Sequence, residues 1–274
     1  MANFFSCSLA RLWNVIALIF FERRACALCQ VELAEEAKSK DCKSNNLCHD
    51  CLSFFQSLTE VRTTLIGDDE NDVIECFASG YYSGPLQEAI YQIKYLKRPE
   101  LAQSLAFTLI PPTMALLSLR NNPENADNCQ ENFILVPVPL HPSKLKERGF
   151  NQAEELAFHL SEQLKIKMQA ESLRRIRPTR AQFGLSRSQR RRNLEGAFQA
   201  AKSIRGKNVI LVDDVLTSGA TIYECALAVV KGGGTVVGAI TLARARWQKR
   251  ESAPDERSSD ARTCVPASSL QLLL

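Results

Sequence analysis

Residues 209–221 read VILVDDVLTSGAT: an apolar run, then two adjacent carboxylates, then a turn rich in Thr, Ser and Gly. The run predicts a buried strand, and residues 219–231 predict the helix that follows. Backbone N–H groups and the positive dipole end at the start of such a helix can bind a phosphate dianion. The hydroxyls of the turn add donors, and Gly219 lets the backbone approach a ligand closely. Simple capping of a helix after a strand needs neither the second acid nor every hydroxyl of this turn.

Asp213 and Asp214 are expected at the carboxyl end of the strand. Open α/β sheets bind ligands in the crevice outside the carboxyl ends of their parallel strands. Two carboxylates there can accept hydrogen bonds from ribose hydroxyls, directly or through Mg²⁺. The candidate site is therefore the acidic pair together with the turn residues Thr217, Ser218, Gly219, Ala220 and Thr221.

The rest of the chain predicts an α/β sheet around this strand. Buried-type strands are expected at 76–82, 133–140, 208–215 and 235–244, and helices at 84–96, 100–119, 150–168 and 219–231. Pro111 and Pro112 must break or restart the helix that contains them. Residues 60–72 are polar and acidic and are expected to form a loop or linker. Alternation of strands and helices indicates a parallel sheet covered on both faces.

Two cysteine pairs predict a metal site near the N-terminus. Cys26-x-x-Cys29 and Cys48-x-x-Cys51 are separated by 18 residues, a spacing typical of a tetrahedral zinc site with four protein ligands. Such a closed site is structural, and the metal would supply folding energy to a segment too small to build its own core. Cys42 and His49 remain competitors for one ligand position.

Composition and charge exclude several classes of protein. The 274 residues are 45% hydrophobic and 23% charged, which excludes a collagen-like chain and a fully disordered one. The net charge of +4 depends on one segment, because eight Arg and no acid lie between Glu171 and Glu195. Without these eight the net charge would be −4, so the chain is not a general polycation. They are Arg174, Arg175, Arg177, Arg180, Arg187, Arg190, Arg191 and Arg192.

The two ends of the chain are predicted to lie outside the α/β domain. Residues 1–24 have apolar positions at helical spacing and predict an amphipathic helix that packs on the protein or, alternatively, anchors at a membrane surface. The apolar run at 12–21 is too short to span a bilayer, and charge follows it, unlike in a signal peptide. We therefore expect a cytoplasmic protein without a transmembrane span. The expected domains are 1–24, a zinc-binding module at 25–60, the α/β domain at 73–244 and a disordered tail at 245–274.

The 209–221 string closely resembles the motif with which type I phosphoribosyltransferases bind 5-phosphoribosyl-1-pyrophosphate (PRPP). Two further stretches, LVPVPLHPSKLKERGFNQAEELA (135–157) and RPTRAQFGLSRSQRRRNLEGAF (177–198), resemble the signatures of the ComF family. The resemblance covers roughly residues 25–244 and includes the cysteine-rich start. It implies a type I phosphoribosyltransferase-like α/β fold with a small N-terminal zinc-ribbon-like module that holds its metal with four cysteines.

The resemblance also assigns site residues. It implies that Asp213 and Asp214 contact the ribose hydroxyls and that residues 217–221 hold the 5′-phosphate. It places the pyrophosphate on the first signature stretch, where Lys146, Arg148 and Gly149 are the candidates. On the second stretch, Gln182, Arg187 and Arg191 would belong to a mobile loop that closes over the site.

The sequence leaves two classes of function open. If the chain transfers a phosphoribosyl group, catalysis should be electrostatic, with Mg²⁺ neutralising the departing pyrophosphate. The sequence identifies no acceptor. The other class is a non-enzymatic PRPP sensor or a protein that binds single-stranded or branched DNA. This class is considered because the ComF family is linked with competence and DNA uptake. Other DNA-uptake proteins are then possible partners. The Arg-rich segment could be a solvated face, a binding surface for PRPP, or one for a nucleic-acid backbone.

Overall fold

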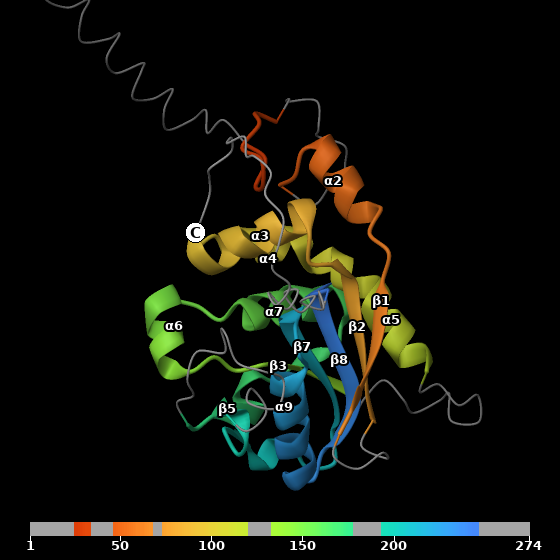
Figure 1. The fold of residues 1–274 in the computed structure, drawn as a ribbon, viewed down its shortest axis with the longest axis vertical. Helices are drawn as coiled ribbons and strands as arrows, with labels where there is room; N and C mark the ends of the chain where they lie inside the picture. The colour runs from red at the N-terminus through yellow and green to blue at the C-terminus, as the bar shows by residue number, and fades with distance from the viewer. Residues whose placement is uncertain (1–24, 34–45, 68–72, 120–132, 178–192, 247–274) are drawn as a thin grey trace, which may run out of the picture.

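The computed structural model describes residues 25–33, 46–67, 73–119, 133–177 and 193–246. Its centre is a six-stranded sheet with the strand order β1-β2-β8-β7-β3-β4 (Figure 1). In that order the strands span Val61–Ile66, Val73–Tyr81, Thr235–Arg244, Asn208–Leu216, Phe133–Pro137 and Lys167–Met168. β1 is antiparallel to β2, and every other neighbouring pair is parallel. The sheet confirms the predicted α/β class, with a parallel sheet flanked by helices.

Helices cover both faces of this sheet, which explains why its central strands are almost continuously apolar. One face packs against α3 (Gly84–Tyr95), α4 (Glu100–Leu105), α5 (Ile110–Ser118) and α7 (Gln152–Leu164). The opposite face packs against α9 (Ala220–Lys231) and a small two-stranded sheet of β5 (Leu173–Arg175) and β6 (Phe198–Ala200). The remaining described elements are α2 (His49–Gln56), α6 (Pro142–Arg148) and three 3-10 turns at Ala106–Leu109, Ala170–Ser172 and Lys202–Ile204.

Two predicted helices end or restart for local reasons. Pro111 and Pro112 lie in the first turn of α5, where the missing proline N–H has no helical partner to lose, so the predicted restart is confirmed. The helix expected at 150–168 ends at Leu164, because Lys165 adopts a left-handed conformation with φ 58°. Residues 167–168 then leave the helix and pair with β3 as β4.

The prediction of a loop over residues 60–72 was wrong for its first half. Val61–Ile66 form β1, which pairs with β2 along its whole length. The local sequence VRTTLI is rich in β-branched residues and alternates between exposed and more buried positions, as an edge strand does. The acidic run that follows dominated the composition of the window and hid this pattern.

The described part of the cysteine-rich segment packs into the core of the α/β domain. Cys26, Ala27 and Leu28 are buried in the same hydrophobic cluster as Leu86 and Ile90 of α3. In Figure 1 this segment and α2 lie at the top of the molecule, next to α3 and α4. The four-cysteine module is therefore packed onto one face of the α/β domain.

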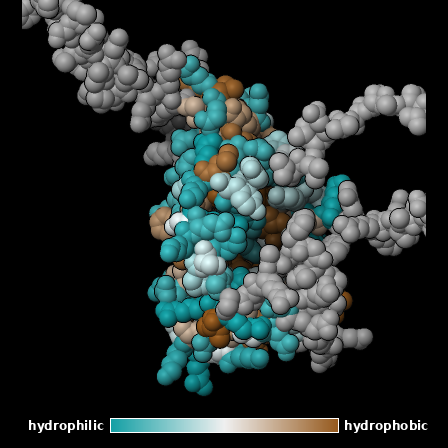
Figure 2. All heavy atoms as spheres, turned by 60° about the vertical axis from the view of Figure 1, so that its left-hand side comes forward, coloured by the Kyte–Doolittle hydropathy of each residue, from teal (hydrophilic) through white to brown (hydrophobic). Residues whose placement is uncertain are grey.

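The surface is mostly hydrophilic on the side that carries α6, with hydrophobic residues in small patches (Figure 2). Within the described residues, one stretch is long and apolar enough to cross a membrane by length and composition, namely Glu100–Ser118. Its most apolar part is 56% buried inside the protein, where it packs as α4 and α5 against the sheet. This burial is typical of a core helix.

Candidate functional site

The acidic pair lies where the neighbouring strand β3 has just ended. Val138, the first residue after β3, donates its backbone N–H to the carbonyl of Val212 at 2.9 Å. Asp213 and Asp214 follow Val212 on β7, so their carboxylates lie at the carboxyl edge of the parallel sheet. The sequence predicted this position correctly. It is the edge at which open α/β sheets bind ligands.

The two carboxylates face opposite sides of the sheet, because successive residues of a strand alternate between its faces. Asp214 is buried and forms an ion pair with Lys94 of α3, with 2.8 Å between Nζ and Oδ2. Asp213 lies on the side of α9, where burial and then the Asp213 charge raise the pKa of the Cys225 thiol. The backbone N–H of Asp214 donates to Oδ1 of Asp213 at 2.9 Å.

Burial and the Asp214 charge raise the pKa of Asp213 to about 7, although the Lys94 charge opposes them. Burial alone would lower the pKa of Lys94, but the charge and hydrogen bond of Asp214 raise it overall. The site therefore holds one carboxylate neutralised by a lysine and a second that titrates near physiological pH. Carboxylate oxygens are the ligands that Mg²⁺ accepts, normally together with water and substrate phosphates, so the donor set fits this ion.

The turn between β7 and α9 has the geometry of an anion site. Gly219 adopts a left-handed conformation with φ 80°, and α9 begins at the next residue. A Cβ atom on Gly219 would meet the side chain of Leu65 in β1, so a larger residue would need Leu65 to move as well as a strained backbone. Ser218 is buried and accepts a hydrogen bond from the N–H of Ala220 at 3.4 Å, whereas Thr217 is exposed. The turn leads directly into the N-terminus of α9, the end of a helix that favours a phosphate dianion.

Arg244, at the end of β8, holds the start of this turn in place. Its guanidinium donates to the carbonyls of Leu216, at 3.0 Å, and Thr217. Its Nε donates to the hydroxyl of Thr63 in β1 at 3.2 Å. Arg244 of β8 therefore links the turn to Thr63 of β1, and these hydrogen bonds fix the start of the turn.

The predicted pyrophosphate segment follows β3 and forms α6. Arg148 donates to Gln152 at 3.0 Å, its guanidinium lies 5.6 Å from the ring centroid of Tyr95, and its charge acts on Lys94. Lys146 is exposed on α6, and Gly149 ends the helix with φ 88°. α6 thus approaches the end of α3 that carries Lys94. Arg148 lies close enough to Lys94 for their charges to interact, and Lys94 in turn pairs with Asp214.

Within the RGFNQ signature, Asn151 has a structural role. Its side chain donates to the carbonyl of Val138 at 3.1 Å and accepts from the N–H of Ala153 at 3.1 Å. It therefore ties the end of β3 to the start of α7. Phe150, beside it, packs against the core.

Three other predicted residues, Gln182, Arg187 and Arg191, lie outside the described residues. The arginines of the same segment that the structure describes interact within the protein. Arg174 pairs with Glu171 at 2.7 Å, and the guanidinium of Arg175 lies 5.5 Å from the ring centroid of Phe198. Arg177 donates to the carbonyl of Asn193 at 3.3 Å and to that of Glu195, which joins the two flanks of residues 178–192.

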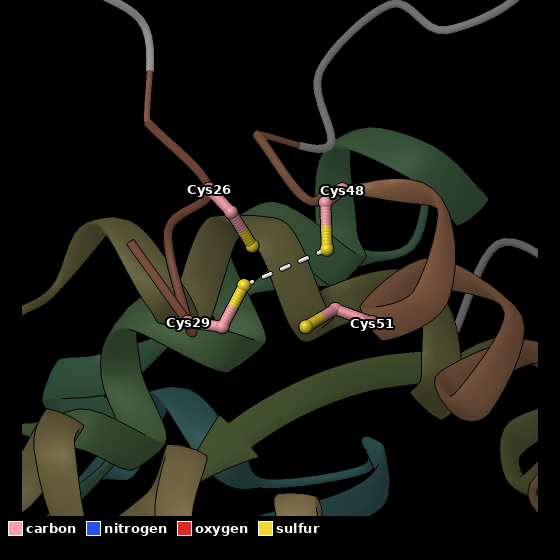
Figure 3. Close-up of side chains that lie close together, drawn as sticks. All are labelled: Cys26, Cys29, Cys48 and Cys51. Atoms are coloured by element: carbon pink, nitrogen blue, oxygen red, sulfur yellow. Dashed lines mark hydrogen bonds between the residues drawn. The ribbon is translucent and has the colours of Figure 1, made fainter. Parts of the chain in front are cut away.

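The cysteine pairs meet in one cluster, as their spacing predicted. The Sγ atoms of Cys26, Cys29, Cys48 and Cys51 all lie within 4.8 Å of one another and point toward a common centre (Figure 3). Two of them, on Cys29 and Cys48, are 3.6 Å apart. Tetrahedral zinc with Zn–S bonds of about 2.3 Å places its sulfur atoms roughly 3.8 Å apart, so this four-cysteine cluster fits the ion.

The thiols of the cluster differ in their environment. Burial and hydrogen bonds with neighbouring thiols raise the pKa of Cys51, and the pKa of Cys29 is also raised, although a backbone hydrogen bond from Val31 opposes this. Burial raises the pKa of Cys26, but backbone hydrogen bonds from Cys48, Cys29 and Leu28 outweigh it and lower this pKa to about 7. All six cysteines among the described residues are free thiols. Of the two reserve ligands, His49 is exposed at the start of α2 and does not belong to the cluster, and Cys42 lies outside the described residues.

Sequence reasoning missed Lys94 and Arg244. Lys94 lies on a predicted amphipathic helix, directly after Ile93 and four residues after Ile90. A lysine at the edge of this apolar face is the sequence signal that could have singled it out. Arg244 closes the predicted strand at 235–244, where an arginine after a buried apolar run needs a polar partner. Neither partner could be identified before the fold was known.

Comparison with known proteins places these motifs in a family. A model of the phosphoribosyl transferase domain matches residues 147–267. The DNA utilization protein YhgH of Escherichia coli (strain K12) is 33% identical over 163 residues, which cover 60% of this chain and 69% of that protein. Competence protein F of Haemophilus influenzae is 32% identical over 169 residues, covering 61% and 71%.

Two further matches are more partial. Competence protein ComFC of Bacillus subtilis is 34% identical over 116 residues, which cover 42% of this chain and 45% of that protein. The solved structure of adenine phosphoribosyltransferase from Thermoanaerobacter pseudethanolicus aligns with a TM-score of 0.28 and 17% identity, over 50% of this chain and 73% of that one. From the domain match and the relatives named for competence and DNA utilization, we conclude that the chain belongs to the ComF family.

Proposed function

We propose that this protein binds PRPP together with Mg²⁺ at the carboxyl edge of β3 and β7. One observation carries the proposal. A single strand–turn–helix unit presents an acidic pair, of which Asp214 is buried, and a phosphate-type turn in which Gly219 adopts a positive φ and lies against the Leu65 side chain. The match of the phosphoribosyl transferase domain to residues 147–267 supports the same ligand.

Each part of PRPP has a partner of matching chemistry in this proposal. The first-turn N–H groups and hydroxyls of residues 217–221 bind the 5′-phosphate. Asp213 and Asp214 receive the ribose hydroxyls and would hold the metal. Arg148, Lys146 and the backbone at Gly149 bind the pyrophosphate, joined by Lys94 when a ligand competes for Asp214.

Bound Mg²⁺ would neutralise charge on the pyrophosphate. The residues of this chain then orient the sugar and exclude water, with no protein nucleophile needed. Transfer requires an acceptor, which the described residues do not identify, so we propose PRPP binding as the common step of an enzyme and of a sensor. A cytoplasmic location, with reduced cysteines and bound zinc, belongs to this proposal.

Calorimetric titration of the zinc-loaded protein with PRPP, with and without Mg²⁺, tests it. We expect binding that depends on Mg²⁺ and that is lost in the double variant Asp213→Asn/Asp214→Asn. Glu162→Gln, which changes an exposed acid on α7, serves as the control and should bind as the wild type does. A folded wild-type protein that binds no PRPP overturns the proposal.

A second function, binding of single-stranded nucleic acid, is favoured by the surface between α3 and α6. Tyr91 and Tyr95 are exposed on α3, with ring centroids 5.1 Å apart. Around them lie the cations Arg148, at the Tyr95 ring, and Lys97, whose charge reaches Glu147 on α6. Exposed aromatic rings beside cations bind bases by stacking and phosphates by charge. The described arginines of the 174–192 segment are instead paired within the protein.

Fluorescence anisotropy with a labelled oligonucleotide tests this second function. We expect affinity to fall steeply with salt and to drop about 10-fold or more in Tyr91→Ala/Tyr95→Ala, at about 1–3 kcal/mol per stacked base. Phe158→Ala removes another exposed aromatic ring, on α7, and should leave binding unchanged. Equal loss in both variants, or binding insensitive to salt, contradicts an interface at α3.

A further inference from the structure

Helix α3 contacts both the four-cysteine cluster and the acidic pair. Its apolar face, with Leu86 and Ile90, shares a hydrophobic cluster with Cys26 and Leu28. Near its other end, Lys94 forms the 2.8 Å ion pair with Asp214. A shift of this helix against the cysteine segment would therefore move the cation away from its carboxylate.

Gln92 is the polar link between the two regions. It is buried, and its Nε2 donates to the backbone carbonyl of Leu28 at 3.4 Å and to Oε1 of Glu88 at 2.9 Å. Its Oε1 accepts from Arg98 at 2.9 Å, and Arg98 is in turn paired with Glu100. Both ends of the amide are thus used, and leaving a buried amide unpaired is costly.

The partner carbonyl belongs to the metal site. Leu28 lies between Cys26 and Cys29, inside the first cysteine pair. The N–H of Ala27 donates to the carbonyl of Asn46, which joins this pair to the second one. A metal held by all four thiolates fixes the backbone of this loop and with it the direction of the Leu28 carbonyl.

We propose that metal binding at the four-cysteine cluster and ligand binding at the acidic pair are energetically coupled through α3, with Gln92 as the positioning residue that acts through Lys94. This inference rests on the proposed function, because PRPP is the ligand of the second site. In this proposal zinc fixes the Leu28 carbonyl, and that carbonyl accepts the hydrogen bond from Gln92. Helix α3 then keeps Lys94 at a fixed place, where it pairs with Asp214 in the free protein and can bind the pyrophosphate when PRPP is present. Without zinc, α3 loses its polar anchor and Lys94 its fixed position.

Coupling between two binding sites is reciprocal, which gives the test. If zinc raises the affinity for PRPP–Mg²⁺ by some factor, PRPP–Mg²⁺ raises the affinity for zinc by the same factor, typically about 5- to 150-fold. We would measure zinc affinity by competition with a chromophoric chelator, with and without saturating PRPP and Mg²⁺. The wild type should bind zinc about 10-fold more tightly with PRPP.

Two substitutions of the same kind on α3 separate coupling from general damage. Gln92→Met removes the donor to Leu28 at similar volume, and we expect it to reduce the coupling factor toward 1 while zinc still binds. Gln87→Met changes an exposed glutamine of the same helix and should keep the wild-type factor. Zinc affinity that is equal with and without bound PRPP overturns the coupling, and an unchanged factor in Gln92→Met overturns the role of Gln92.

A second measurement decides the matter if PRPP does not bind. Lysine acylation followed by mass spectrometry reports how well Lys94 is protected, with exposed Lys144 as the internal reference. In the ligand-free, zinc-loaded protein, Lys94 should react severalfold faster in Gln92→Met than in the wild type or Gln87→Met. Equal protection of Lys94 in all three proteins overturns the inference independently of the proposed function.

Discussion

The turn after β7 and the helix α3 both contribute to the candidate site, but they are built in different ways. The turn and its acidic pair lie within thirteen consecutive residues, and their geometry follows from a strand end, a left-handed Gly219 and a helix start. α3 contributes Lys94 from a distant part of the sequence, and that helix is held by the cysteine segment and by Gln92.

This difference shows which substitutions should disturb each half of the site, where the local half is the turn with its acidic pair and the distant half is α3 with Lys94. The local half depends on backbone conformation and on contacts of single atoms, such as Leu65 against Gly219. The distant half depends on a metal site and on one buried ion pair. Perturbations of the distant half should therefore cost more stability, and the expected effects below run from the largest to the smallest.

Loss of the metal site should have the largest effect. Cys26→Ser removes a thiolate that is 0% exposed and that lies in the shared hydrophobic cluster. We expect loss of bound zinc and a decrease of more than about 4 kcal/mol in the free energy of unfolding, the range associated with loss of a metal. Zinc content and denaturant unfolding measure both.

Cys42→Ser is the control for this variant, because Cys42 is the reserve ligand outside the described residues. It should keep one zinc per chain and wild-type stability. If Cys26→Ser keeps its zinc while Cys42→Ser loses it, the ligand set proposed from Figure 3 is wrong.

Breaking the buried ion pair should come next. Lys94→Met leaves the Asp214 carboxylate buried without its cation, and we expect the free energy of unfolding to fall by about 2 to 4 kcal/mol at pH 7. In the double variant Lys94→Met/Asp214→Asn the loss should be smaller than the sum of the single losses, since the uncompensated charge is gone. Chemical denaturation of the four proteins completes the cycle.

The exposed pair of Lys144 and Glu147 provides the comparison. Its members are 2.7 Å apart, but their side chains are 53% and 61% exposed. Lys144→Met should therefore cost less than about 1 kcal/mol, as exposed pairs usually do. Equal losses at the two lysines would mean that Lys94 contributes no more than a surface ion pair.

A change in the local half should have a smaller effect on stability and a large one on binding. Gly219→Ala must accommodate φ 80° and a Cβ atom pressed against the Leu65 side chain, which we expect to cost about 2 to 3 kcal/mol and to abolish binding of PRPP. Gly206→Ala is the matched control, with φ 70° and nothing within 4 Å of the added atom. It should cost only about 1 kcal/mol and leave binding intact.

A double variant separates crowding from backbone strain. If the contact with Leu65 matters, Gly219→Ala should be partly rescued by Leu65→Ala, which opens space for the new Cβ atom. An absence of rescue, with Gly206→Ala equally destabilised, would mean that backbone conformation alone explains the glycine.

The same contrast explains what the sequence could predict. The strand β7, the turn and the cysteine cluster were predicted correctly because their residues lie close in the chain at spacings fixed by local geometry. β1 was missed because an acidic run dominated its window, and yet its Leu65 packs against the phosphate-type turn. Lys94 and Arg244 were missed because their partners are set by the order of strands and by the packing of α3, which no local pattern contains.

The smallest expected change in stability concerns the local half and has the opposite sign. Asp213→Asn should stabilise the protein above pH 7, because burial and Asp214 raise the pKa of Asp213 to about 7 from an ordinary value of 3.8. Between these pH values the folded protein keeps a proton that the unfolded chain has released, so the stability of the wild type falls as pH rises through this window and levels off above it. Asparagine has no proton to lose, and its Oδ1 can still accept the N–H of Asp214.

The advantage of Asp213→Asn should therefore be small near pH 4 and grow up to about pH 7. The full shift in pKa corresponds to about 4 kcal/mol, at about 1.4 kcal/mol for each unit. Because Asp213 is partly exposed to solvent, which screens its charge, we expect about 1 to 3 kcal/mol. Unfolding by urea from pH 4 to 8 measures it, with Glu162→Gln as a control that should show no such trend. Binding of PRPP should meanwhile be weakened at every pH. A carboxylate that lowers stability at the pH where it would bind its ligand is what a trade-off between stability and function predicts for a binding residue. A constant difference in stability between the two proteins across this pH range would instead show that Asp213 ionises without penalty and that burial does not tune the site.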